Sequence, residues 1–316
     1  MSAASVLDTA LDRTLIGYSN AGYLIRRNFW PPDPAPDALR GCVAVVTGAN
    51  SGLGKATTAG LARLGATVRM IVRRPDAGEA AREDILAELP GAQLLVEECD
   101  VSSFDSVRRY AEDFTGPLHV LVHNAGVMPD ECTLSADGHE LALATHVLGP
   151  HLLTSLLRSA LLREGAGRVI WVTSGGMYGR KLPATDLEYE QQEYRPAVAY
   201  ARTKRMQAVL TRCWAEQLRD TGVVVHAVHP GWADTPGITR GLPKFAVLTR
   251  PLLRTPEQGA DTAVWVAAAD PPARSTGELW HDRAQRPFHY TRATRETPAA
   301  RQSFWATCQR LTGAGA

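Results

Sequence analysis

The sequence predicts an α/β fold with one doubly wound parallel sheet and helices on both of its faces. Three observations support this prediction. Short apolar segments alternate with helical patterns from residue 43 onward, a glycine-rich turn follows the first apolar segment, and small or polar residues follow the later ones. Ligands bind at the carboxyl ends of the strands in such a sheet, so these turns are where a site is expected.

Apolar and β-branched residues predict strands at 43–47, 67–72, 93–98, 118–123, 168–173, 223–228 and 277–281. Helical periodicity predicts a helix after the glycine turn and others at 76–89, 103–114, 145–163, 198–219 and 256–268. Right-handed crossovers between successive strands then give the doubly wound arrangement. No change of composition separates a second domain within residues 41–290.

Two terminal segments flank this domain, an extension at residues 1–40 and a helical tail at 291–316 with a pattern over 299–311. Ser5 and Asp8 resemble a capping box and an apolar stripe follows, which predicts a helix. The prolines of residues 31–36 predict a stiff linker. The stripe either packs on the domain or makes a peripheral membrane contact through residues 6–30, helped by Arg26, Arg27, Phe29 and Trp30.

Composition excludes several classes of function. The net charge is +1 and no block of like charge occurs, which argues against a nucleic-acid partner. Five widely spaced cysteines without a C-x-x-C motif predict reduced thiols in a cytoplasmic protein and no metal site. No apolar run approaches the roughly 18 residues that span a bilayer, and the acidic N-terminus does not resemble a secretory signal.

The glycine-rich turn has the spacing G-x-x-x-G-x-G, with Gly48, Gly52 and Gly54. Glycine permits backbone angles closed to other residues and leaves no Cβ to block a pyrophosphate. The first turn of the following helix offers N–H groups to the same phosphates. We therefore expect a Rossmann-type dinucleotide site that also includes Asn50, Ser51 and Leu53, although a plain glycine-rich turn is the alternative.

The residues that follow the next three strands extend this prediction. Val72 stands near the point where an NAD-selecting site places an acid, and Arg73 and Arg74 follow it; a guanidinium suits the 2′-phosphate of NADP. Solvated surface arginines are the alternative, and NAD remains the second choice of cofactor. Asp100 and Val101 are placed to meet the adenine, and small residues let the ribose and nicotinamide approach the backbone at Asn124, Ala125 and Gly126.

Three further residues suggest proton transfer. Ser174 follows the fifth strand, and Tyr200 and Lys204 share one face of the next helix. A phenol with a pKa near 10 exchanges protons poorly at neutral pH, but a neighbouring ammonium and the nicotinium charge are expected to lower the pKa of Tyr200. Ser174 would hold a carbonyl or carbinol oxygen while the nicotinamide carries the hydride. A coincidental surface pair is the alternative.

These residues resemble the short-chain dehydrogenase/reductase family, of the classical type. The resemblance rests on T-G-A-N-S-G-L-G (47–54), D-V (100–101), N-A-G (124–126), Ser174, Y-A-R-T-K (200–204) and H-P-G-W-A-D-T-P-G (229–237), and covers about residues 41–290. Within the family, V-T-S-G-G-M (172–177) and G-A-D-T-A-V-W (259–265) resemble the dehydrogenase/reductase SDR family member 12 group. The order of these motifs is highly specific.

The resemblance implies a role for each residue. Tyr200 would be the catalytic acid/base, Lys204 would bind the nicotinamide ribose, and Ser174 would orient the substrate. The nicotinamide would be covered by Pro230, Gly231 and Thr235. The protein would then transfer a hydride between NADP(H), or NAD(H), and an apolar carbonyl or alcohol. The alternative is a family-like protein that binds the cofactor but acts as a sensor or scaffold.

One residue departs from the family pattern. His146 stands where the family usually has an asparagine that holds a proton-relaying water. An imidazole could replace this relay, impair it, or serve only as a core residue. His146 is therefore a candidate catalytic residue without an assigned role.

Two loops are expected near the substrate. Residues 182–196 are acidic and form either an insertion beside the cleft or a solvated loop. Residues 232–254 would close over the cofactor, and apolar side chains there would face the substrate or pack on the domain, at Phe245, Val247, Leu248, Leu252 and Leu253. The sequence leaves the oligomeric state undecided. A homo-oligomer is one alternative, because relatives pair through the helices expected at 145–163 and 198–219.

Overall fold

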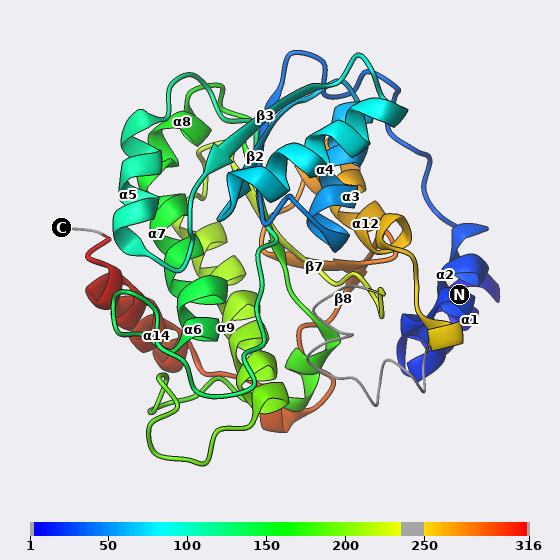
Figure 1. The fold of residues 1–316 in the computed structure, drawn as a ribbon. Helices are drawn as coiled ribbons and strands as arrows, with labels where there is room; N and C mark the ends of the chain where they lie inside the picture. The colour runs from blue at the N-terminus through cyan, green and yellow to red at the C-terminus, as the bar shows by residue number, and fades with distance from the viewer. Residues whose placement is uncertain (1–2, 235–249, 315–316) are drawn as a thin grey trace.

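A computed structural model describes residues 3–234 and 250–314 of the chain. Its centre is an eight-stranded sheet in the order β3-β2-β1-β4-β5-β6-β7-β8. Figure 1 shows helices packed around this sheet and labels β2, β3, β7 and β8. The strands are β1 (Val43–Thr47), β2 (Thr67–Val72), β3 (Gln93–Glu98), β4 (Val120–His123), β5 (Arg168–Val172), β6 (Val224–Val228), β7 (Glu278–His281) and β8 (Ala284–Arg286). The predicted doubly wound parallel sheet is confirmed, and the strand order reverses between β1 and β4.

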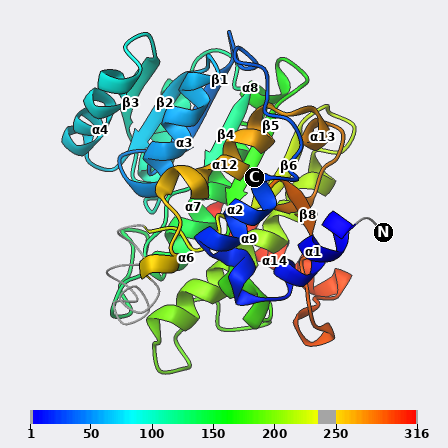
Figure 2. The same cartoon turned by 90° about the vertical axis from the view of Figure 1, so that its right-hand side faces the viewer.

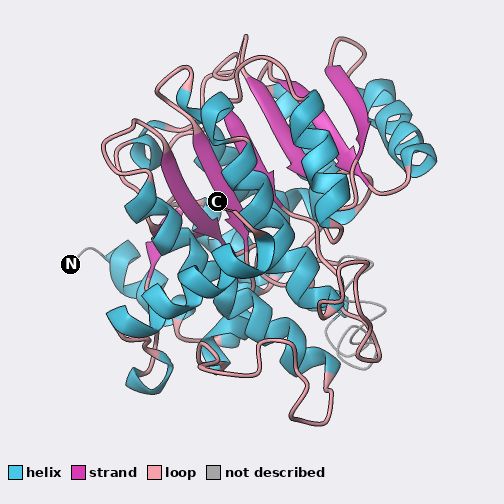
Figure 3. Ribbon diagram, turned by 90° about the vertical axis from the view of Figure 1, so that its left-hand side faces the viewer, coloured by secondary structure: helices cyan, strands magenta, loops and turns pink. Residues whose placement is uncertain are grey.

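Two layers of helices cover the sheet. One face carries α3 (Gly52–Arg63), α4 (Pro75–Glu88) and α12 (Pro256–Ala268); the other carries α5 (Phe104–Asp113), α7 (Gly149–Leu156) and α9 (Pro196–Gln217). Figure 3 looks onto the second layer, whose helices lie in front of the strands. Short helices α8 (Arg158–Leu162) and α13 (Asp270–Ala273) follow α7 and α12.

Strand β8 was not predicted. It is three residues long and has no apolar alternation, and it pairs antiparallel with β7. The connecting residues Asp282 and Arg283 both have positive φ angles, 51° and 56°. This tight turn brings the Asp282 side chain beneath the sheet edge, where it is buried.

The helix expected over 145–163 is interrupted, so that prediction was wrong. The structure has α6 (Leu141–Leu143), a π-helical turn over Ala144–Leu148, and then α7 and α8. Pro150 has no N–H to donate to the carbonyl of His146, four residues earlier. The Gln207 side chain donates to that carbonyl instead, at 3.0 Å.

The C-terminal helix α14 (Pro298–Thr312) lies on α7 and α9. The Trp305 ring packs 4.8 Å from His151 and 5.0 Å from Trp214, measured between ring centroids. The helices on which relatives were expected to pair are thus partly covered by the chain's own tail.

The N-terminal segment contains α1 (Ala3–Asp12), a 3₁₀ turn (Leu15–Tyr18) and α2 (Asn20–Arg27), and Figure 2 shows it beside β8. Helix α1 already includes Ala3, so the predicted capping box at Ser5 was wrong. Asp8 instead accepts hydrogen bonds from Arg26 and Arg286. Arg26 is buried, which corrects the expectation that its charge faces a membrane. None of the helices formed by the described residues is long and apolar enough to cross a bilayer.

Candidate active site

The glycine-rich turn between β1 and α3 forms a cradle with no room for side chains. Gly48 and Gly52 have positive φ angles of 66° and 51°. A Cβ on Gly54 would lie 2.1 Å from the Gly48 carbonyl oxygen. Ser51 precedes α3 without forming a side-chain capping bond, so the first-turn N–H groups remain available to a ligand. These features fit a bound pyrophosphate.

Thr47 and Asn124 hold the cradle in shape. The Asn124 amide donates to the carbonyls of Thr47 (2.9 Å) and Gly48 (3.3 Å). The backbone N–H groups of Asn124 and Ala125 both donate to the Thr47 hydroxyl at 3.0 Å. The role of Thr47 was missed, although it is the first residue of the motif that predicted the turn.

The residues expected near the adenosine end follow β2 and β3. Arg73 and Arg74 are exposed just beyond β2. Asp100 uses one carboxylate oxygen to accept bonds from the backbone N–H (3.0 Å) and hydroxyl (2.7 Å) of Ser102. Val101 is buried. Asp100 therefore shapes its own turn after β3.

Ser174, Tyr200 and Lys204 come together in the structure. Ser174 follows β5, and its hydroxyl hydrogen-bonds with that of Tyr200, which lies on α9. Burial raises the pKa of Tyr200 to about 12, and the bond to Ser174 opposes this rise. Without a bound cofactor, desolvation outweighs the bond to Ser174, so the pKa of Tyr200 lies above its usual value. The expected lowering by a nicotinium charge together with Lys204 stays a prediction.

Lys204 lies one turn further along α9 and points toward β5. Its ammonium donates to the Val172 carbonyl at 2.9 Å and lies 5.3 Å from the centroid of the Tyr200 ring. Burial lowers the pKa of Lys204 to about 7. Near neutral pH, Tyr200 therefore keeps its proton while Lys204 titrates.

His146 packs edge-on against the Tyr200 ring, with centroids 5.5 Å apart, but both of its ring nitrogens have other partners. Nε2 accepts from the Val127 N–H at 2.8 Å. Nδ1 lies 2.7 Å from the Thr203 hydroxyl, which itself donates to the Tyr200 carbonyl. This arrangement requires a neutral ring that donates from Nδ1. Burial and Lys204 lower the pKa of His146 far below its usual value.

Thr203 and Gln207 were not predicted as site residues. They contact the side chain and the carbonyl of His146, as described above. Gln207 follows Lys204 by three residues, so helical spacing offered a signal that was not used.

The stretch after β6 carries the residues expected to cover the nicotinamide. Gly231 has a φ of 75°, and a Cβ there would lie 2.4 Å from Nε of Arg254. Of the apolar residues expected in this loop, Leu253 is buried and Leu252 is exposed. Other predicted residues lie outside the described part of the chain, namely Thr235, Phe245, Val247 and Leu248.

The acidic loop at 182–196 is attached to the domain. Glu188 accepts from the Glu140 N–H (2.9 Å) and contacts His139 Nδ1 (2.8 Å). The Arg202 guanidinium, on α9, stacks on the buried Tyr189 ring at 4.6 Å and donates to the Asp186 carbonyl. The loop is therefore tied to the helix that carries Tyr200 rather than freely solvated.

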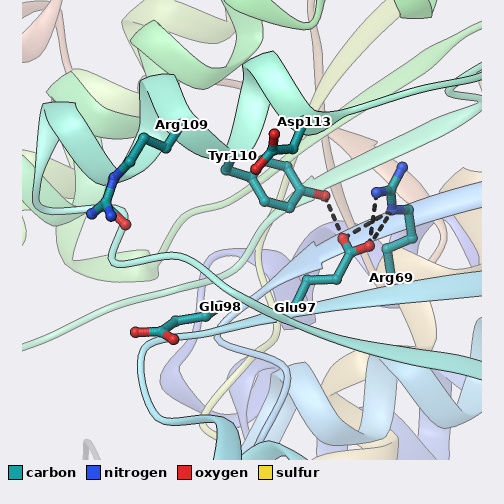
Figure 4. Close-up of a pocket in the computed structure, with 7 residues that line it drawn as sticks. Arg69, Glu97, Glu98, Arg109, Tyr110 and Asp113 are labelled. Atoms are coloured by element: carbon teal, nitrogen blue, oxygen red, sulfur yellow. Dashed lines mark hydrogen bonds and ion pairs between the residues drawn. The ribbon is translucent and has the colours of Figure 1, made fainter.

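A separate hollow lies at the β3 edge of the sheet, between β3 and α5 (Figure 4). Glu97 accepts bonds there from Arg69 (2.7 Å) and the Tyr110 hydroxyl (2.8 Å). Glu98, Arg109 and Asp113 complete its charged lining. No group of His, Cys, Asp and Glu within residues 3–234 and 250–314 is arranged to hold a metal ion.

Comparison with known proteins agrees with this geometry. The family model for short chain dehydrogenases matches residues 42–242. Human dehydrogenase/reductase SDR family member 12 is 35% identical over 288 residues, which are 90% of each chain. Human retinol dehydrogenase 12 is 36% identical over 77% of this chain and 78% of its own. A Beutenbergia cavernae protein described as an NAD(P) dependent gluconate 5-dehydrogenase, solved with bound NADP, is 27% identical with a TM-score of 0.64 over 78% of this chain and 97% of its own.

Proposed function

The chain belongs to the short-chain dehydrogenase/reductase family, and we propose that it transfers a hydride between NADP(H) and a carbonyl or alcohol through Ser174, Tyr200 and Lys204. The contact between the Ser174 and Tyr200 hydroxyls, beside a side-chain-free cradle, carries this proposal. The family is one of oxidoreductases, and its relatives support a nicotinamide cofactor.

The residues divide the work of a carbonyl reduction. The cradle at 48–54 binds the pyrophosphate, and the bound nicotinamide supplies the hydride for the carbonyl carbon. Ser174 donates a hydrogen bond to the carbonyl oxygen, and Tyr200 passes its proton to that oxygen. The raised pKa of Tyr200 keeps this proton in place at neutral pH. Lys204 then stabilises the phenolate that remains, and the same steps reversed oxidise an alcohol.

Arg73 and Arg74 support NADP over NAD, because both guanidinium groups are exposed beyond β2 and can meet a 2′-phosphate. We expect Arg73→Ala to weaken NADPH binding roughly ten- to hundredfold and to leave NADH binding nearly unchanged. Arg82→Ala, on the neighbouring helix α4, is the matched control. Titration of cofactor fluorescence measures both, and a wild-type preference for NAD would contradict the assignment.

A panel of carbonyls and alcohols tests the proposed activity. It should include apolar aldehydes, because one relative is named a retinol dehydrogenase. We expect consumption of NADPH with at least one carbonyl of the panel. Tight NADPH binding without turnover on any compound would instead support the sensor or scaffold alternative.

His146 is proposed to be a structural residue beside the catalytic trio. His146→Asn should keep turnover within a few-fold or raise it, and should cost about 1–3 kcal/mol in unfolding free energy, because the Val127 N–H or the Thr203 hydroxyl loses its partner. Steady-state kinetics and thermal unfolding measure the two effects. A large loss of turnover with unchanged stability would show that the imidazole has its own catalytic role.

We also propose that the N-terminal segment contacts an anionic lipid surface. Helix α2 exposes apolar side chains and buries a charged one. Tyr23 and Arg26 face the protein, whereas Leu24 and Ile25 are 50% and 37% exposed. In the same segment, Leu7, Ile16 and Phe29 are 40%, 57% and 58% exposed. Arg13 and Arg27 are exposed as well, whereas Asp8 and Asp12 are paired with arginines. Apolar side chains flanked by cations match an anionic membrane surface.

Flotation with phosphatidylcholine vesicles that contain phosphatidylglycerol tests this surface. We expect the wild type to float and the double variant Leu24→Ser, Ile25→Ser to float roughly tenfold less. Leu95→Ser is the control, since it removes a 51% exposed leucine at the β3 edge. Failure of the wild type to float would contradict the proposal, as would a concentration-dependent dimer that the double variant abolishes.

A further inference from the structure

Three consecutive carbonyls of the N-terminal segment hold the two ends of the loop that follows β6. The Tyr18 carbonyl accepts from the Trp232 N–H at 2.8 Å. The Gly17 and Ser19 carbonyls accept from the Arg254 guanidinium at 2.9 and 3.2 Å. Trp232 and Arg254 are themselves joined, because the Arg254 N–H donates to the Trp232 carbonyl at 2.7 Å. Residues 17–19 therefore contact the chain both at Trp232 and at Arg254.

A buried ion cluster fixes these carbonyls in place. Asp282 accepts from Arg254 at 2.6 and 2.9 Å and from Arg26 at 2.9 Å. Arg26 also donates to the Gly17 carbonyl at 2.9 Å. All three charged side chains are at most 3% exposed. The positions of the N-terminal segment, the loop and the β7–β8 turn are thus linked by the same carboxylate.

Aromatic rings add a second set of contacts at this place. The Tyr18 ring lies 4.9 Å from His229, 5.4 Å from His281 and 6.2 Å from Trp232, measured between centroids. His229 and His281 are stacked at 4.7 Å. The Tyr18 ring therefore covers the first residue of the H-P-G-W stretch.

This stretch adjoins the proposed catalytic residues. A Cβ on Gly175, the residue after Ser174, would lie 2.8 Å from Nε2 of His229. A Cβ on Gly231 would lie 2.4 Å from Nε of Arg254. There is thus no free space between the Ser174 turn, His229, Gly231 and the groups that residues 17–19 hold.

We propose that Tyr18 is a positioning residue of the active site: its ring and the carbonyls of residues 17–19 set the place of residues 229–232 against the nicotinamide end of the cofactor. The proposal rests on the proposed function for the identity of that cofactor. Tyr18 does not touch the reacting atoms. It acts through His229 and Trp232, so its loss changes cofactor binding without removing the proton donor.

Two readouts separate this role from simple support of the fold. Tyr18→Ala should weaken NADPH binding about three- to tenfold and raise its KM more than it lowers kcat. In the cofactor-free protein, the amide of Trp232 should exchange its hydrogen at least several-fold faster. Tyr18→Phe keeps the ring and should restore both values. Leu11→Ala is the matched control, because Leu11 is buried in the same segment and none of the ring contacts above involves its side chain.

The outcomes are distinguishable. Normal exchange at Trp232 in Tyr18→Ala, or equal effects in Leu11→Ala, would overturn the positioning role. Faster exchange at Trp232 in Tyr18→Ala, with the wild-type rate restored in Tyr18→Phe, would support the positioning role even if the wild type bound no NADPH. A wild type that binds no NADPH would overturn the proposed function but not the positioning role.

Discussion

Two buried polar clusters, around Asp282 and around Lys204, differ in how their charges are balanced. In the cluster around Asp282, the carboxylate is paired with two guanidinium groups. In the cluster around Lys204, the ammonium has only the Val172 carbonyl as partner, and no carboxylate of the described residues is within ion-pair distance. Both clusters are almost fully shielded from water.

The difference separates holding a position from moving a proton. Burial alone would raise the pKa of Asp282, but His281, Arg254 and Arg26 together lower it below its usual range, so the carboxylate keeps its charge. Burial without pairing brings the pKa of Lys204 to about 7, and it raises that of its neighbour Tyr200. The paired cluster is suited to fixing the loop, and the unpaired one to proton exchange.

The largest expected effect comes from breaking the paired cluster. Asp282→Asn keeps the shape and tolerates the positive φ. It leaves Arg254 buried without a carboxylate partner among the described residues, whereas Arg26 keeps Asp8 and Asp12. We expect a loss of about 3–5 kcal/mol in unfolding free energy, measured by denaturant titration. A loss below about 1 kcal/mol would show that this cluster does not hold the fold together.

Removing the unpaired charge of Lys204 should change the unfolding free energy in the opposite direction. Lys204→Met should abolish turnover yet stabilise the protein at pH 7 by about 1–3 kcal/mol. The folded-state pKa of about 7 lies below the unfolded value, so the unfolded chain binds more protons between them. Wild-type stability from this group therefore rises as the pH rises from about 7 to about 10, by up to about 1.4 kcal/mol per pH unit. Unfolding titrations across this window should show the slope reduced in the variant, and an unchanged slope would contradict the shifted lysine.

The smallest effect is expected at the opposite edge of the sheet. Glu97 also contacts an arginine and a tyrosine (Figure 4), but its side chain is 21% exposed. Glu97→Gln should cost no more than about 1 kcal/mol in unfolding free energy. The Arg69–Glu97 ion pair that it removes is partly exposed, and water already screens it. A cost equal to that of Asp282→Asn would mean that burial does not explain the contrast.

The sequence was most informative where local pattern decides structure. Strands β1, β2 and β3 and helix α12 begin and end at the predicted residues. Ser174, Tyr200 and Lys204 meet because a strand end and an i, i+4 helix spacing place them together.

Long-range contacts were beyond the reach of these patterns. The carboxylate of Asp282 joins Arg26 across 256 residues and Arg254 across 28, and no periodicity links such positions. The π-helical turn depends on Pro150 and on a Gln207 side chain from another helix. The direction of the Tyr200 pKa shift depends on desolvation, which only the packed structure reveals.

Single-turnover reduction by Tyr200→Phe tests the central claim most directly. With NADPH bound and a carbonyl substrate found in the panel, we expect the rate of hydride transfer to fall by about 10²–10⁴-fold, while the Kd for NADPH stays within about twofold of wild type. A variant that binds NADPH normally and still reduces the carbonyl within tenfold of the wild-type rate would contradict the assignment of Tyr200 as the proton donor.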